Sequence, residues 1–324
     1  MLPLFYENPY NETDEQGRCR QTAVPFLFFT DSMSKGVRTM AKIACVQMNC
    51  EKGKISETTE RMVAYVREAA ANGAELVILP EGIYQGYVFE SYEELYPLAE
   101  EVPAGTISQT MIRLAKELKV YIIWGMYEKC GIRLYNSAVL VGPEGHVGTY
   151  RKMHYWETEA RYCEPSDSGF PVYDTALGKI AIIICYDLWF PESSRIAVLQ
   201  GADLIVTPTG WVKMESVPDP IPGYPAANVL CIATAHTNGV CVAASARVGS
   251  EGATNWVGHS LICAPSGQIV ARAGDDREEI IYAELDLRKT KETRMWGKRC
   301  HILANRRTDY YDETLGYDCE LYPM

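Results

Sequence analysis

The chain has 324 residues, of which 47% are hydrophobic and 23% are charged, so it holds enough apolar material for one large domain or two small ones. A formal net charge of -11, without any run rich in lysine and arginine, argues against nucleic acid or an anionic membrane as the main partner. No apolar run reaches the length of a transmembrane helix, and the apolar run at 23–29 is too short for a secretory signal.

Cysteine and histidine usage excludes several classes of site. The eleven cysteines form no C-x-x-C pair, and none of the five histidines has metal-ligand spacing to another histidine or cysteine. We therefore expect no metal and no cofactor, and neither a zinc ribbon nor a thioredoxin-type motif. Unpaired cysteines within apolar segments are typical of a reducing compartment, which predicts a cytoplasmic protein.

The two ends of the chain differ from its middle. Residues 1–39 are polar and irregular, and we expect a poorly ordered N-terminal extension or sequence upstream of the natural start. A surface arm packed on the fold is the alternative. Residues 40–309 are predicted to form one domain. Residues 310–324, rich in Tyr, Asp and Glu, are predicted to be a C-terminal tail that is disordered or docks on a partner subunit.

Short apolar strands alternate with helical patterns from residue 42 onward, which predicts an α/β fold with many hairpins. The predicted helices cover 56–72, 108–118, 191–199 and 226–236. The predicted strands cover 42–48, 75–79, 120–127, 134–141, a short segment ending at 150, and then 179–185, 202–208, 240–246, 258–264, 269–273 and 279–285.

The strand predicted at 179–185 ends on a cysteine, Cys185, and Pro191 opens the helix that follows. A cysteine at such a junction lies on a sharp turn with backbone N–H groups close by, where α/β enzymes hold a nucleophile. The segment alone leaves a second interpretation open, because most free cysteines are buried structural residues.

Two other strand ends carry residues that suit the same chemistry. Glu81 follows the strand at 75–79, and Lys152 follows the strand that ends at 150. A carboxylate at the end of a buried strand is costly unless it is paired or used, and catalytic groups gather at the carboxyl ends of strands in open α/β sheets. Together these residue types could deprotonate a thiol, stabilise an oxyanion and attack a carbonyl carbon.

Three motifs carry a family resemblance: Pro80-Glu81, Tyr150-Arg151-Lys152 and the segment 185–192. They resemble the signature motifs of the nitrilase superfamily, the carbon–nitrogen hydrolases, and the resemblance spans about 41–306. It implies a four-layer αββα sandwich of the carbon–nitrogen hydrolase type, usually a homodimer or a higher homo-oligomer, and catalysis through a thioester acyl-enzyme.

The resemblance also implies roles for individual residues. Cys185 resembles the nucleophile, Glu81 the general base and Lys152 the cation that stabilises the oxyanion. A second, substrate-orienting glutamate maps onto Glu159. Glu157 is its rival, because the loop after Lys152 is short and the correspondence could slip.

The residues around the nucleophile bear on the substrate. The backbone N–H of Tyr186 would complete the oxyanion hole. Leu188 and Trp189 stand where N-carbamoyl-D-amino acid amidohydrolases, which this chain also resembles, carry an arginine that binds a substrate carboxylate. Leu188, Trp189 and Trp211 suggest an apolar substrate pocket, and Tyr87 is assigned to the same pocket. Alternatively, Trp211 and Tyr87 are aromatic side chains that pack within loops.

These observations predict a cysteine-dependent hydrolase that cleaves a small primary amide, aliphatic or derived from an amino acid, to a carboxylic acid and ammonia. The alternatives are an N-carbamoyl compound amidohydrolase and a nitrilase that converts a nitrile to acid and ammonia. A non-catalytic member of the superfamily and a cysteine-based redox protein are disfavoured. His154 is interpreted as a locally bonded loop residue, and Asp187 and Glu192 as charges at a helix start.

Overall fold

A computed structural model of the chain describes residues 40–166, 168–214, 216, 218–308 and 310–311, together with two short strands near the N-terminus. The chain divides into two compact units, Thr39–Leu303 and a unit formed by the two terminal segments. Within the terminal unit, β1 (Glu7–Asn8) pairs antiparallel with β2 (Thr22–Ala23). Apart from these strands and residues 310–311, the predicted extension at 1–39 and tail at 310–324 lie outside the described residues, so their boundaries stay predictions.

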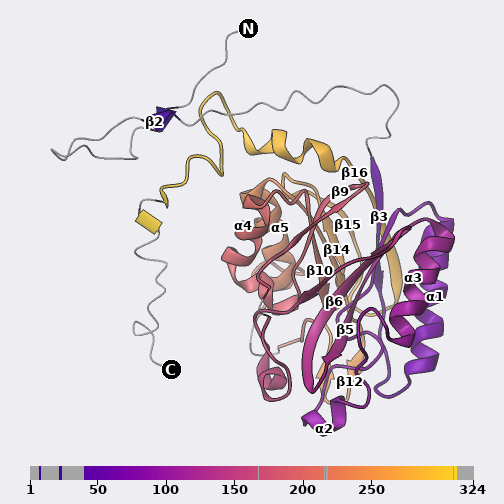
Figure 1. Ribbon diagram of the computed structural model, residues 1–324. Helices are drawn as coiled ribbons and strands as arrows, with labels where there is room; N and C mark the ends of the chain where they lie inside the picture. The colour runs from indigo at the N-terminus through magenta and orange to yellow at the C-terminus, as the bar shows by residue number, and fades with distance from the viewer. Residues whose placement is uncertain are drawn as a thin grey trace. The chain divides into compact units, whose positions relative to one another are not determined.

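Two six-stranded sheets form the centre of the unit Thr39–Leu303, with helices on their outer faces (Figure 1). The order is β16-β3-β4-β5-β6-β7 in the first sheet and β15-β14-β11-β10-β9-β8 in the second. The members of the first sheet are β3 (Ala41–Gln47), β4 (Leu76–Ile78), β5 (Tyr121–Cys130), β6 (Arg133–Gly142), β7 (Gly145–Arg151) and β16 (Glu279–Leu285); those of the second are β8 (Val172–Thr175), β9 (Gly178–Ile182), β10 (Leu204–Thr209), β11 (Cys241–Ala246), β14 (Leu261–Cys263) and β15 (Ile269–Arg272).

Alternation along the strands separates the two faces of the first sheet. Ile43 and Cys45 of β3 lie in the core between the sheets, whereas Ala44 belongs to the core under the helices α1 (Ile55–Ala71) and α3 (Thr106–Leu118). Because successive strand side chains point to opposite faces, a strand buried on both sides is apolar throughout. Strands of this kind gave the continuous apolar runs in the sequence.

The second sheet is covered by α4 (Pro191–Leu199) and α5 (Ala226–Asn238), which pack against each other and, in the case of α5, on β11 and β14. Proline suits the first turn of α4 because the missing N–H would have no partner there. Helix α5 ends at Gly239, which has a φ of 57° and lies too close to Arg294 for a side chain. The arrangement confirms the predicted αββα sandwich.

Several short elements were not predicted. The predicted strand at 179–185 ends at Ile182, and a 3₁₀ helix already begins at Cys185. The sequence patterns of such segments are too brief to show a period. The unpredicted elements are α2 (Tyr92–Leu95), β8, the hairpin β12 (Ser250–Glu251) and β13 (Thr254–Asn255), and three 3₁₀ helices: η1 (Glu157–Arg161), η2 (Cys185–Trp189) and η3 (Leu287–Arg294).

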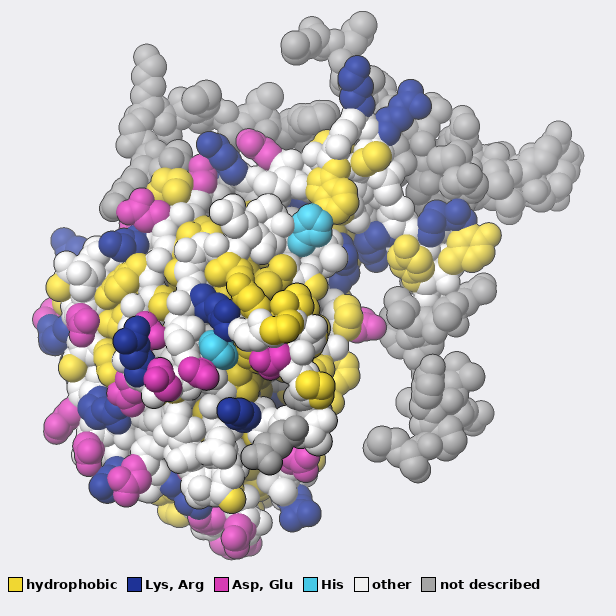
Figure 2. All heavy atoms as spheres, turned by 180° about the vertical axis from the view of Figure 1, so that it is seen from behind, with side chains coloured by type: hydrophobic (Ala, Val, Ile, Leu, Met, Phe, Trp, Pro, Cys, Tyr) yellow, Lys and Arg dark blue, Asp and Glu magenta, His cyan; other side chains and the backbone are white. Residues whose placement is uncertain are grey.

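The described surface mixes charges of both signs. On the face shown in Figure 2, acidic and basic side chains are interspersed with apolar ones. Among the described residues, no helix combines the length and apolar character that a bilayer crossing requires.

Candidate active site

Lys152 lies fully buried between two carboxylates. Its Nζ donates to Glu81 Oε1 at 2.8 Å and to Glu159 Oε2 at 2.7 Å, and neither glutamate is more than 1% exposed. We call Glu81, Lys152 and Glu159 the charged cluster. A buried ammonium is tolerated only when paired and hydrogen-bonded, and these two carboxylates meet that requirement.

The electrostatics of the charged cluster keep Lys152 protonated. Burial alone would lower the pKa of Lys152, but Glu159 and Glu81 together raise it well above its ordinary value. Burial raises the pKa of Glu159, an effect that Lys152 opposes and Glu81 reinforces. With both carboxylates ionised the charged cluster carries one net negative charge, which suits a group that accepts a proton.

Glu81 is placed by a close backbone approach at the end of β4. The backbone of the next strand, β5, contacts the backbone of Glu81 at Gly125. A Cβ atom added at Gly125 would lie 2.4 Å from the Cα of Glu81. Only glycine leaves room for this contact. The carboxylate is also anchored from the second sheet, because Gly210 N donates to Glu81 Oε2 at 2.9 Å. Both sheets therefore position the carboxylate.

Cys185 opens η2 with a φ of 46°, in the left-handed region that residues other than glycine rarely adopt. Burial and Glu81 raise the pKa of its thiol well above the ordinary value, whereas Lys152, the Thr209 hydroxyl and the Gly210 amide lower it. The raised pKa means that the resting group is a thiol. A nucleophilic attack by Cys185 thus needs a base, and Glu81 lies near enough to raise the pKa of the thiol.

Tyr186, the second residue of η2, brings its N–H into the first turn, where amides lack partners within their own helix. Its ring packs edge-on against Trp156 at 5.0 Å and lies 6.1 Å from Trp189. Trp189 is 38% exposed and lies 6.4 Å from Trp211, which is buried. The aromatic wall, as we call Trp156, Tyr186, Trp189 and Trp211, begins at the residue next to Cys185.

The other two residues assigned to the pocket are both buried. Tyr87 donates its hydroxyl hydrogen to Glu159 Oε2 at 2.9 Å, and its ring packs edge-on against Trp256. Leu188 is 2% exposed and belongs to the hydrophobic core that also contains Cys185. Tyr87 therefore touches the charged cluster, whereas a contact between Leu188 and substrate stays a prediction.

The geometry separates the two candidate orienting glutamates. Glu159 is buried in η1 and also accepts from Trp156 N at 2.8 Å, which holds its Oε2 toward Lys152. Glu157 is exposed, with a φ of 50°. Of the two, Glu159 alone bonds Lys152 among the described contacts.

Asp187 joins the nucleophile turn to the strand that carries Lys152. Its Oδ2 accepts from Tyr150 Oη at 2.7 Å and from Ile184 N at 2.9 Å. Its Oδ1 accepts from His154 N at 3.0 Å and faces His154 Nδ1 at 2.8 Å. Both predicted helix-start charges lie in the first turn of a helix, Asp187 in η2 and Glu192 in α4. Asp187 is in addition fully buried and bonded to Tyr150 and His154, which the sequence did not indicate.

Sequence reasoning also missed Asn136 on β6, whose side-chain amide donates to Glu81 and to Glu159. A signal was present, because Asn136 stands within an apolar strand and buried amides need partners. The partners could not be inferred, since they lie 55 and 23 positions away in the sequence.

Replacing Asp187 with asparagine is expected to destabilise the protein by about 2 kcal/mol. The substituted amide would turn a donor toward at least one of the N–H groups of Ile184 and His154, which now donate to the carboxylate. Urea unfolding would show a lower midpoint with an unchanged slope. Glu192→Gln, which alters an exposed acid in the first turn of α4, should lower the midpoint much less, since such a charge contributes under about 1 kcal/mol. Equal effects of the two substitutions would contradict the assignment.

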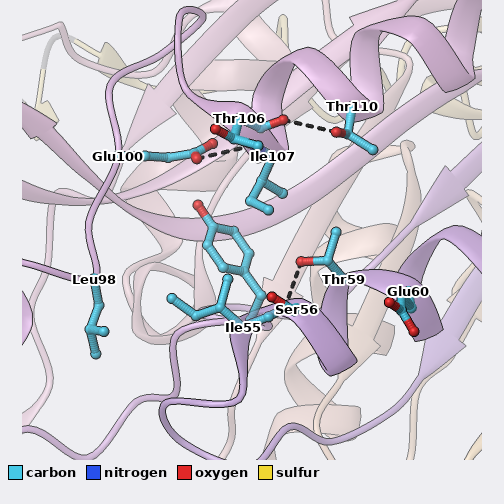
Figure 3. Close-up of a pocket in the computed structure, with 10 residues that line it drawn as sticks. Ile55, Ser56, Thr59, Glu60, Leu98, Glu100, Thr106, Ile107 and Thr110 are labelled. Carbon is cyan, nitrogen blue, oxygen red and sulfur yellow. Dashed lines mark hydrogen bonds between the residues drawn. The ribbon is translucent and has the colours of Figure 1, made fainter.

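A separate cavity of about 380 Å³ opens between α1 and α3 (Figure 3). Its polar groups are used by the fold: Thr59 Oγ1 donates to Ile55 O, Thr110 Oγ1 donates to Thr106 O, and Glu100 accepts from the first amides of α3. No residue of the charged cluster lines this cavity. We assign it no part in the chemistry.

The chain was compared with known proteins. The model of the family "Carbon-nitrogen hydrolase" matches residues 42–295. A nitrilase from Pyrococcus abyssi is 37% identical over 272 residues, which cover 84% of this chain and 99% of that protein. An N-carbamoylputrescine amidase from Solanum lycopersicum is 32% identical over 297 residues, with 86% and 96% covered.

A solved structure has the same fold. The crystal structure of a carbon–nitrogen hydrolase from Helicobacter pylori G27 superposes with a TM-score of 0.77 at 29% identity. The match covers 86% of this chain and 98% of that one, so the two sheets and their helices are shared almost throughout.

Proposed function

The chain belongs to the carbon–nitrogen hydrolase family and hydrolyses carbon–nitrogen bonds other than peptide bonds, and we propose that it cleaves a small primary amide through a thioester on Cys185. One observation carries the proposal. Lys152 is fully buried between Glu81 and Glu159, and the charges of Glu81 and Lys152 lie near enough to shift the pKa of the Cys185 thiol. A thiol, a base and a cation are the groups that amide hydrolysis through an acyl-enzyme requires.

Acylation begins when the Cys185 sulfur attacks the amide carbonyl carbon while Glu81 accepts the thiol proton. The oxyanion that forms lies between the Lys152 ammonium and the Tyr186 N–H, and one such donor lowers the barrier by about 3 kcal/mol. Glu81 then gives its proton to the leaving nitrogen. The carbon–nitrogen bond breaks, ammonia departs and a thioester remains on Cys185.

Deacylation uses the same groups with water as the nucleophile. Glu81 takes a proton from water, which attacks the thioester carbon, and the second oxyanion is stabilised in the same place. The carbon–sulfur bond breaks, the carboxylic acid leaves, and Glu81 returns the proton to the thiolate. In this scheme Glu159 orients Lys152 and the substrate.

The surroundings of Cys185 support a substrate without a carboxylate near the scissile bond. Leu188 and Trp189 stand where N-carbamoyl-D-amino acid amidohydrolases carry a carboxylate-binding arginine. The aromatic wall offers apolar contact, and aromatic faces also attract ammonium groups. We therefore favour a neutral or amine-bearing primary amide, either aliphatic or derived from an amino acid.

The names of two relatives favour specific alternatives. The tomato relative is named an N-carbamoylputrescine amidase, and an N-carbamoyl amine presents the same terminal amide group to a nucleophile. The archaeal relative is named a nitrilase. A nitrile would also form a covalent adduct with Cys185 and release ammonia when hydrolysed.

A panel of compounds with one shared carbon skeleton separates these classes. We expect the primary amide to give the highest kcat/KM for ammonia release, ahead of the N-carbamoyl amine and the nitrile. An N-carbamoyl amino acid should be slower by about 100-fold, because its carboxylate would lie unpaired against the aromatic wall. Ammonia release from the nitrile alone would overturn the assigned substrate class.

Trp189 offers a matched pair of variants for the same assay. Trp189→Arg should raise the preference for the carboxylate-bearing compound relative to the neutral amide, since guanidinium pairs with carboxylate. Trp189→Ala removes the indole without adding a cation and should leave that ratio unchanged. A similar ratio in both variants would place Trp189 away from the substrate.

The homodimer also stays a proposal. Trp189 of η2 and Ile196 and Leu199 of α4 are apolar and between 38% and 48% exposed. Apolar surface that is exposed in one chain favours burial against another subunit. This is the surface that we expect a second copy of the chain to cover.

A further inference from the structure

The side chain of Asn136 lies between the two carboxylates of the charged cluster. Its Nδ2 donates to Glu81 Oε1 at 2.7 Å and to Glu159 Oε1 at 2.5 Å, and its backbone carbonyl accepts from Lys152 N at 2.8 Å. A primary amide nitrogen carries two hydrogens, so both are used. Asn136 and Lys152 thus bridge the same two carboxylates from adjacent strands and close a ring of hydrogen bonds.

The two carboxylate oxygens of Glu81 differ in the number of hydrogen bonds that they accept. Oε1 accepts from both Lys152 and Asn136, which occupies its two lone pairs. Oε2 accepts from Gly210 N at 2.9 Å, and the described contacts include no second donor to it. One lone pair of Oε2 therefore remains for a proton, and Gly210 also lies beside the Cys185 thiol.

We propose that Asn136 is a positioning residue that holds Glu81 so that Oε2 carries the proton between Cys185, the leaving nitrogen and water. The inference rests on the proposed function, in which Glu81 is the general base. An amide suits this place because it supplies two hydrogen bonds without adding charge. An aspartate at position 136 would instead place a third carboxylate beside Glu81 and Glu159, with only the Lys152 ammonium to balance them.

Asn136, Lys152 and several titratable side chains surround the two carboxylates. Hydrogen bonds from Asn136 and Lys152 lower the pKa of Glu159, against the effects of burial and Glu81. Cys185 stays a thiol, as described above. Burial raises the pKa of the remaining neighbours, which are neutral near pH 7: Tyr87, Tyr127, Tyr155, Tyr162 and Cys163.

Alkylation of Cys185 by iodoacetamide tests the proposal without substrate turnover. The sulfur forms a bond to the reagent's methylene carbon, iodide leaves, and the thiol proton passes to Glu81. The labelling rate, followed by peptide mass spectrometry, should rise with pH as the base ionises. Glu81→Gln identifies this step, because the substitution should remove it.

In Asn136→Ala the step should move to higher pH, because the carboxylates lose a donor that favours their ionised form. The rate above the step should fall by about 10- to 100-fold, because the base is no longer held. Asn136→Ser, a smaller perturbation that keeps one hydroxyl donor, should give an intermediate shift and covers the case in which the alanine variant does not fold.

Ser137→Ala is the matched control. Ser137 is the next residue of β6, points to the opposite face and donates to buried Glu128 at 2.7 Å. It should keep the wild-type profile even if stability falls. An unshifted step in a folded Asn136 variant, an equal shift in Ser137→Ala, or a wild-type profile without a Glu81-dependent step would each overturn the inference. Failure of wild type to release ammonia from any compound would instead overturn the proposed function.

Discussion

Replacing Cys185 with alanine is expected to abolish ammonia release, lowering kcat by at least about 10⁴-fold for every accepted compound. No other group in the proposed site can form the acyl-enzyme, so the loss should not depend on substrate class. The fold should be retained, because the substitution removes a single sulfur atom. Unchanged circular dichroism and a near-normal unfolding midpoint would establish this.

Cys263→Ala is the control for the loss of a buried thiol. Cys263 lies in β14, fully buried, and no proposed step uses it. Its alanine variant should lose some stability through the cavity it creates but keep its kcat. Retained turnover in Cys185→Ala, or equal loss in both variants, would contradict the assignment of the nucleophile.

Replacing Lys152 with methionine should affect both activity and stability. The oxyanion would lose its cation, and Glu81 and Glu159 would face each other without the ammonium that each now contacts. Breaking a buried ion pair in this way typically costs about 3–5 kcal/mol, and kcat should fall by at least about 100-fold. Unfolding in urea and steady-state kinetics would measure the two effects.

The stability loss in Lys152→Met should depend on pH in a defined direction. Without the ammonium, at least one carboxylate has a folded-state pKa raised above its unfolded value. Such a group stabilises the fold fully below the unfolded pKa, and that contribution is lost as pH rises through the folded pKa. The difference from wild type should therefore be larger at pH 8 than at pH 5.

Lys179→Met is the matched control, because Lys179 forms an exposed ion pair with Asp174 at 3.2 Å. Exposed pairs contribute little to stability, so this variant should resemble wild type at both pH values. If Lys152→Met were no less stable than Lys179→Met, the charged cluster would not be held together by its ion pairs.

The sequence was informative about the strands and the motifs at their ends. Apolar strands such as β4 are continuous runs because both faces are buried, and Glu81, Lys152 and Cys185 each follow a strand. The structure brings Glu81 and Lys152 into contact although 71 positions separate them. Glu159 also meets Lys152, as the correspondence with the family's second glutamate implied.

Residues whose hydrogen-bond partners lie far away in the sequence were harder to predict. Asn136 depends on the register that sets β6 beside β7, and Asp187 depends on the turn that η2 makes at Cys185. Neither the register nor the left-handed conformation of Cys185 leaves a local signal. The sequence therefore placed Asp187 at a helix start, as observed, but not its bonds to Tyr150 and His154, and it did not single out Asn136.

Rapid-quench mass spectrometry during turnover of an accepted amide tests the central claim most directly. The account predicts that the peptide containing Cys185 gains the mass of the acyl group before the acid product accumulates, and that hydroxylamine removes the added mass. The adduct should be absent from Cys185→Ala. An acyl group found on another residue, or turnover without any adduct on Cys185, would contradict the account.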